Sequence, residues 1–154
     1  MKLLRDDQGQ STLETALVLL LLILMLFSLV EGGRVLYTYH YLAYAARRGS
    51  RYAMVRGAAC DSSNGMPTCP LAVPDGQQVQ TYLRSQAYPG IDASQVSVTV
   101  TWSPSPSETT CPTATCNNPG DEVTVNTGYV FNTIVLPIQF SFSLGSTSQR
   151  IISQ

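Results

Sequence analysis

The stretch that decides the fold of this chain is Thr15–Val30, which reads TALVLLLLILMLFSLV. It carries no charge and is flanked by Glu14 and Glu31. Its 16 residues span only about 24 Å as a helix, short of the ~30 Å hydrocarbon core of a bilayer. Counting from Gln10 lengthens the helix to about 31 Å. The longer helix fits a membrane but places Glu14 inside it.

Glu14 has two interpretations. An ionisable side chain at membrane depth is costly and indicates a functional contact there. Alternatively, Glu14 marks the membrane interface and the helix is a slightly short, plain anchor. A cleaved secretory signal is disfavoured because no small-x-small cleavage site follows the run. A buried core helix is disfavoured because the remaining chain is too small and too polar to surround it.

The segment after the membrane predicts a continuation of the helix as a stem over residues 31–57. No proline interrupts it, and a rod from Gln10 to Arg56 would be about 70 Å long. Gly32 and Gly33 are the expected hinge because each glycine costs about 1 kcal/mol relative to alanine in a helix. Small and aromatic residues at three- and four-residue steps predict one packing face: Leu36, Tyr39, Ala43, Ala46, Ser50 and Ala53.

The stem also carries a set of tyrosines and a set of arginines. Its tyrosines predict either contacts with neighbouring subunits or an interfacial belt that also packs the domain onto the stem. Its arginines, chiefly Arg47, Arg48 and Arg51, predict either a solvated face or binding to anionic headgroups or acidic partners.

Four cysteines indicate an oxidising compartment for the part of the chain after the span. They form two close pairs, Cys60 with Cys69 and Cys111 with Cys116. Two local disulfides are favoured, although all three pairings are open. A zinc site is disfavoured because no histidine accompanies the cysteines. Basic residues lie on both sides of the span, so the cysteines decide the topology: the N-terminus is cytoplasmic and residues 58–154 are extracytoplasmic.

Those residues predict a small α+β domain. A helix is expected from Gly76 to Tyr88, with Asp75 as its N-cap. Alternating apolar residues predict three strands: Gln95–Trp102, Asp121–Phe131 and Ile134–Leu144, the last with an edge or bulge at Pro137. Arg150–Ile152 adds a possible short fourth strand. A Ser-, Pro- and Cys-rich loop without regular structure is expected at 103–120. The antiparallel sheet is expected to pack on the stem.

The string Gly9-Gln10-Ser11-Thr12-Leu13-Glu14, leading into the apolar helix, resembles the processing site of type IV prepilins. In that class a dedicated peptidase cuts after the glycine, and a glutamate is the fifth mature residue. The resemblance implies a leader of residues 1–9, a cut between Gly9 and Gln10, and a membrane helix over 10–30. It also implies that Glu14 pairs with the new N-terminal amine of a neighbouring subunit.

A longer stretch, residues 8–57, resembles the N-terminal region of TadE-like proteins, the pseudopilin-like components of tight-adherence (Flp) pilus systems. The resemblance is carried by the GQSTLE start, the step Glu31–Arg34 and the segment Ala45–Ala53. It implies a minor pilin or pseudopilin, anchored once in the inner membrane and able to enter an extracellular pilus. The implied partners are other pilin-like subunits, a prepilin peptidase and an inner-membrane assembly platform.

No catalytic pattern emerges from the sequence. There is no Gly-x-Ser-x-Gly and no phosphate-binding glycine motif, the carboxylates are scattered, and His40 is the single histidine. The chain is therefore predicted not to be an enzyme and to need no cofactor or metal. Its near-neutral net charge gives no case for nucleic acid. The rival function is a membrane-anchored binding or adhesion module that presents the loop 103–120 outside any filament.

Overall fold

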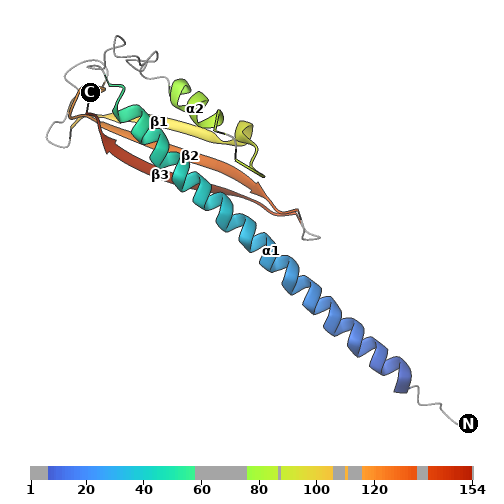
Figure 1. The fold of residues 1–154 in the computed structure, drawn as a ribbon. Helices are drawn as coiled ribbons and strands as arrows, with labels where there is room; N and C mark the ends of the chain where they lie inside the picture. The colour runs from blue at the N-terminus through green and yellow to red at the C-terminus, as the bar shows by residue number, and fades with distance from the viewer. Residues whose placement is uncertain are drawn as a thin grey trace, which may run out of the picture.

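The computed structural model describes residues 7–57, 76–86, 88–105, 110, 116–134 and 139–153. Two helices, a single 3-10 turn and three strands make up the described part of the chain (Figure 1). In chain order they are α1 (Asp7–Met54), α2 (Gln77–Arg84), η2 (Ala93–Gln95), β1 (Ser97–Ser103), β2 (Glu122–Asn132) and β3 (Ser141–Ile151). The predicted α+β class, with a long N-terminal helix, one further helix and an antiparallel sheet, is confirmed.

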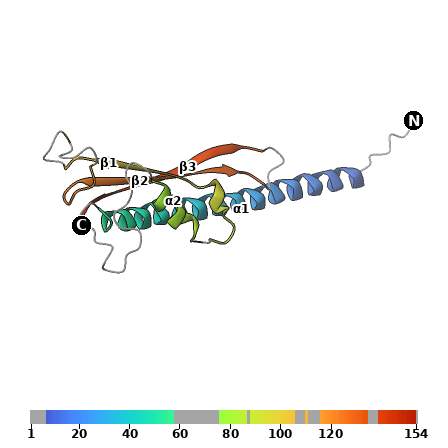
Figure 2. The same cartoon turned by 90° about the horizontal axis from the view of Figure 1, so that it is seen from above.

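The sheet has the strand order β1-β2-β3, and both pairings are antiparallel. In the central strand, Val125 lies opposite Val100 of β1 and Ser148 of β3. Both helices cover the same face of the sheet, with α1 along β2 and β3 and α2 beside β1 (Figure 2). The alternation predicted for the first two strands is confirmed, since Val123 and Val125 are buried while exposed residues alternate with half-buried ones in β1.

The two halves of α1 have different surroundings. The C-terminal half lies on the sheet, and the N-terminal half projects beyond it toward the N-terminus (Figure 1). At 48 residues, α1 is roughly 72 Å long. It is continuous through Gly32 and Gly33, where an added Cβ would meet nothing within 4 Å. Their role as a hinge stays a prediction.

The packing face of the stem differs from the predicted one toward the N-terminal end of the stem. Ala46, Ser50 and Ala53 are buried as expected, but Leu36 is 62% exposed and Tyr39 is also exposed. The predicted stripe advances 17 residues in five steps, whereas five turns need 18, so it drifts by about 100° around the helix. The face that packs is instead lined by these buried residues: Glu31, Thr38, Tyr41, Leu42, Ala45, Ala46, Gly49, Ser50 and Ala53.

Three elements meet at Gly49, where α1 approaches both α2 and β2. A Cβ added there would lie 3.1 Å from a methyl carbon of Leu83 and 3.1 Å from one of Val125. The absence of a side chain therefore allows this close approach. A polar contact also joins the layers, since the buried Thr127 hydroxyl donates to the backbone carbonyl of Leu42 at 3.1 Å.

The predicted second helix is shorter than expected. It ends at Arg84 instead of Tyr88, and its N-cap is Gly76, which makes no side-chain capping bond. The predicted cap Asp75 lies outside the described residues. Only Val79 and Leu83 of α2 are buried, so the apolar stripe that holds this helix on the sheet is already complete before residue 85.

The prediction for the last strands was wrong in its bounds. A single strand, β3, replaces the predicted Ile134–Leu144 and Arg150–Ile152 strands, and residue 134 and residues 139–140 precede it. Its middle, GSTSQ, has no apolar alternation, so nothing local predicts it. Pairing with the full length of β2, from Asn132↔Ser141 to Glu122↔Ile151, holds it in the sheet. Pro137 lies outside the described residues.

Candidate membrane and assembly site

Within the described residues, α1 is the single helix long and apolar enough to cross a membrane. Its most apolar stretch of 18 residues contains no buried residue. All the large apolar side chains from Leu13 to Val30 are exposed. An apolar surface of this extent is not stable in water, so this half of α1 needs lipid or other helices around it. The helix therefore fits a single-pass membrane anchor.

Hydroxyl groups within this apolar half bond to the backbone of their own helix. The Thr15 hydroxyl donates to the Ser11 carbonyl and the Ser28 hydroxyl to the Leu24 carbonyl, each at 2.9 Å. Such bonds remove the cost of placing a hydroxyl in lipid. Glu14 differs, because its exposed carboxylate has no bonded partner among the described residues. The Glu14 carboxylate thus finds no partner within the described fold, and its pairing inside the membrane stays a prediction.

Gly9 and Gln10, the predicted processing residues, lie in the first turns of α1 and are exposed. The structure places them next to the apolar surface and one turn before Glu14. Cleavage of the peptide bond between them stays a prediction.

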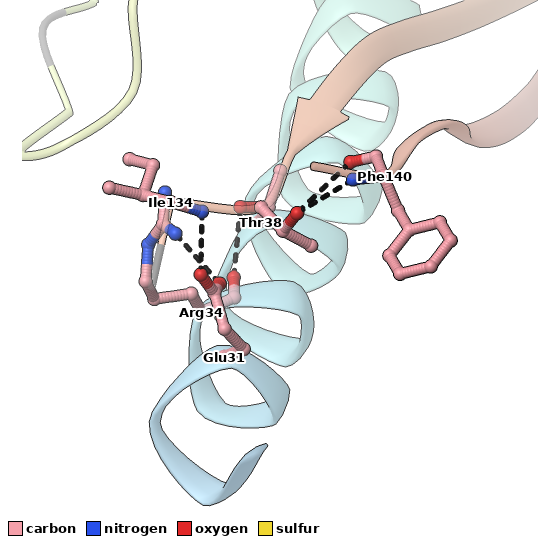
Figure 3. A network of polar contacts seen from close by, with 6 residues as sticks. Glu31, Arg34, Thr38, Ile134 and Phe140 are labelled. Carbon is pink, nitrogen blue, oxygen red and sulfur yellow. Dashed lines mark hydrogen bonds and ion pairs between the residues drawn. The ribbon is translucent and has the colours of Figure 1, made fainter. Parts of the chain in front are cut away.

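Glu31, at the upper end of the apolar half, has partners for both of its carboxylate oxygens (Figure 3). It is only 5% exposed. Its Oε1 accepts from the backbone N–H of Ile134 and its Oε2 from the Arg34 guanidinium, each at 2.7 Å. The Arg34 guanidinium in turn lies 5.0 Å from the centre of the Phe131 ring. These contacts compensate the buried charge and tie the end of the span to the β2–β3 hairpin.

Sequence reasoning treated Glu31 as a flank of the apolar run and missed this role. The spacing of Glu31 and Arg34 at i and i+3 indicates an ion pair on one helix face. The bond to Ile134, 103 residues further on, has no local signal.

Replacing Glu31 with alanine is expected to release the hairpin end from α1. The Ile134 N–H then loses its acceptor and Arg34 its ion-pair partner, at a cost of about 1–3 kcal/mol. Hydrogen exchange at the Ile134 amide should accelerate about tenfold or more, since ~1.4 kcal/mol corresponds to a factor of ten. Glu31→Gln keeps an acceptor oxygen for the amide and should accelerate exchange less. Unchanged exchange in Glu31→Ala would contradict this role.

A second polar surface lies between the upper part of α1 and α2. It is a groove of about 650 Å³ lined by Tyr44, Arg47, Arg48, Arg51, Tyr52, Val55, Arg56 and Tyr82. The Arg48 guanidinium donates to the hydroxyls of Tyr82 at 2.8 Å and Tyr44 at 3.0 Å. Both hydrogen bonds raise the pKa of Arg48, and the one to Tyr82 has the larger effect. The guanidinium therefore stays positively charged.

The height of this groove along α1 separates the two binding hypotheses for the arginines. Arg47 follows Val30 by 17 residues, which is about 25 Å along the helix. Headgroups at the end of the span lie too far below the groove. This distance weighs against anionic lipid, whereas a solvated face and contact with acidic groups of a partner protein both stay predictions.

A family model described as TadE-like protein matches residues 9–51. The N-terminal segment of this chain is TadE-like. The match confirms the resemblance deduced from the sequence for these residues. No curated protein and no solved structure matches the chain.

The TadE-like segment begins at Gly9 and ends within the stem. It contains the exposed apolar half of α1, Glu14, the Glu31–Arg34 pair and three arginines of the groove, Arg47, Arg48 and Arg51. The sheet and α2 lie outside it. The segment thus joins the exposed apolar half of α1 to residues of the domain core, such as Leu42 and Ala45.

Beyond the TadE-like segment, most of the predicted cysteine and loop features lie outside the described residues. Cys116 is buried and disulfide-bonded. Cys60, Cys69 and Cys111 lie outside, as do residues 106–109 and 111–115 of the loop, so the pairing of the four cysteines stays a prediction. The ends of the loop are tied together by Asp121, which accepts from the backbone N–H groups of Ser105 and Asn118.

Proposed function

We propose that this protein is a pilin-like structural subunit, a minor pilin or pseudopilin that enters or primes a tight-adherence pilus or a related secretion filament. The observation that carries the proposal is the bare half of α1. It projects from the folded domain with its apolar side chains and Glu14 uncovered. The TadE-like match over the same residues supports this role, and it supports a structural rather than a catalytic function.

The same surface serves two states in this proposal. Before assembly, lipid covers the apolar half of α1, and after assembly the corresponding helices of neighbouring subunits cover it. A carboxylate inside such a bundle is favourable only beside a positive charge. The N-terminal amine created by a cut before Gln10 would supply that charge. Two unit charges 4 Å apart attract by roughly 4 kcal/mol at an effective dielectric constant of 20, enough to favour one axial register.

The parts of the chain take these roles in the proposal. Residues 1–9 are a cytoplasmic leader, 10–30 cross the inner membrane, and 31–57 form the stem. Residues 58–154 form the extracytoplasmic domain, which the stem carries in a pilin-like arrangement. Other pilin-like subunits, a prepilin peptidase and an inner-membrane assembly platform are the partners, and the arginine groove is a second surface for the subunits.

Processing is the first test of the proposal. Intact-mass measurement on membrane fractions should show a chain that begins at Gln10, lighter than the full chain by the nine leader residues. Gly9→Val should leave the full mass, because a branched side chain then occupies the position before the cut, while Gln8→Ala should not affect the mass. A wild-type membrane-bound chain that still begins at Met1 would refute the processing step.

A further inference from the structure

We propose that one end of the β2–β3 hairpin contacts the membrane that α1 crosses, with its apolar side chains in the lipid interface. This end, called the lower end, is where β2 finishes at Asn132 and β3 begins at Ser141. The inference rests on the proposed anchor role of α1 and adds a second lipid contact, made by the folded domain. In this arrangement the small domain contacts the bilayer directly, and the stem is not its only attachment.

The hairpin end lies at the height of the membrane boundary. Glu31 directly follows the exposed apolar run, and its carboxylate holds the backbone N–H of Ile134 at 2.7 Å. The other end of the hairpin lies at the top of the stem, where the Ser153 N–H donates to the Met54 carbonyl at 3.0 Å. The strands β2 and β3 therefore run along α1, with the Asn132 and Ser141 ends toward the span (Figure 1).

The side chains at the lower end are apolar and uncovered. Ile134 is 74% exposed and Phe140 57%, and Phe142 is also exposed on the adjoining strand. The chain has no charged residue between Glu122 and Arg150, and these two charges lie at the upper end of the hairpin. The nearest charges, Glu31 and Arg34 of α1, neutralise each other in an ion pair. Exposed apolar groups beside such a pair are typical of a surface that meets lipid or protein.

Backbone N–H groups at the lower end already have hydrogen-bond acceptors, which a site poor in water requires. The Thr133 N–H donates to the Phe140 carbonyl at 3.1 Å, and the Phe140 N–H donates to the Thr133 hydroxyl at 2.9 Å. Glu31 accepts from the next N–H, that of Ile134. Backbone groups that enter an interface without a partner are costly, and these described groups are already bonded.

Lipid suits this end better than a second protein because the surface is continuous with the apolar half of α1. In the proposed anchor, the bilayer that covers the exposed Val30 ends beside Glu31, whose carboxylate accepts a hydrogen bond from the Ile134 N–H. A contact with a neighbouring subunit is the competing occupant, and the experiment separates the two.

The test uses tryptophan reporters in the full chain. Trp102 is the single native tryptophan, so each reporter is placed in a Trp102→Phe background. Phe140→Trp reports on the lower end, and Ile151→Trp, at an equally exposed position of the upper end, is the matched control. Phe27→Trp reports on the span. Each variant is reconstituted in phosphatidylcholine vesicles with and without brominated acyl chains.

The expected result is about twofold quenching by brominated lipid and a blue-shifted emission for Phe140→Trp, because tryptophan at an interface contacts lipid. Ile151→Trp should show neither. Ile134→Trp is a second reporter of the lower end, for use if Phe140→Trp fails to fold by circular dichroism. Glu31→Ala should reduce the quenching at the lower end, because it frees the hairpin.

Two results would overturn the inference in different ways. Quenching at Phe27→Trp without quenching at Phe140→Trp and Ile134→Trp would leave the anchor intact and refute the lipid contact of the hairpin. If emission at the lower end then shifted only when subunits assemble, the surface would belong to a protein interface instead. Absence of quenching at Phe27→Trp would refute the anchor, and the inference with it.

Discussion

Replacing Glu14 with glutamine is expected to lower incorporation into filaments about tenfold or more while leaving membrane insertion unchanged. Glutamine keeps the size and the hydrogen-bonding groups of the side chain and removes its charge. The pair with the N-terminal amine of a neighbour is then lost, and a loss of ~1.4 kcal/mol per contact already corresponds to a factor of ten. Insertion should persist because removing a charge from the span makes it more apolar.

The measurement compares the variant in sheared filament fractions and in carbonate-washed membranes. Glu122→Gln is the matched control, since it makes the same chemical change at a carboxylate of β2, far from the span. It should incorporate normally. Glu14→Asp keeps the charge on a shorter side chain and should fall between wild type and Glu14→Gln. Normal incorporation of Glu14→Gln would remove the pairing inside the membrane from the proposed mechanism.

Leu42→Ala is expected to destabilise the folded domain by about 2–5 kcal/mol, the usual cost of truncating a buried leucine. Leu42 is fully buried in the core cluster, and the Thr127 hydroxyl donates to its carbonyl. Since ~1 kcal/mol shifts the melting temperature by about 4–8 °C for a domain of this size, a fall of at least ~8 °C should follow.

Leu36→Ala is the matched control, because it makes the same truncation six residues earlier in the same helix. Leu36 is exposed, so its truncation should change the stability by less than ~0.5 kcal/mol. Thermal unfolding in detergent micelles, followed by Trp102 fluorescence, reports on the sheet and not on the helical span. Equal destabilisation by both variants would mean that the stem packs on a different face.

These two leucines show where prediction from local pattern ends. The predicted stripe included Leu36 because steps of three and four residues accept several neighbouring faces of a helix. The sheet covers only one of them, and the face is chosen by contacts with residues more than 80 positions away, such as Thr127. The same limit applies to Glu31, whose partner Ile134 lies on the hairpin.

The features that the sequence predicted correctly share a local physical cause. The exposed span follows from an uncharged run too long and too apolar for water, and the strands β1 and β2 follow from the two-residue period of valines such as Val98, Val100, Val123 and Val125. The TadE-like segment was recognisable for the same reason, since its residues lie together in the chain.

What required the folded chain was non-local. The β3 strand has a middle without apolar alternation, and it exists because β2 offers a full row of backbone partners. Gly49 has no special place in the sequence, yet α2 and β2 both approach its missing side chain. Sequence periodicity reports which faces can be buried, whereas the long-range pairing of α1, β2 and β3 selects the face that is buried and brings Glu31 to Ile134.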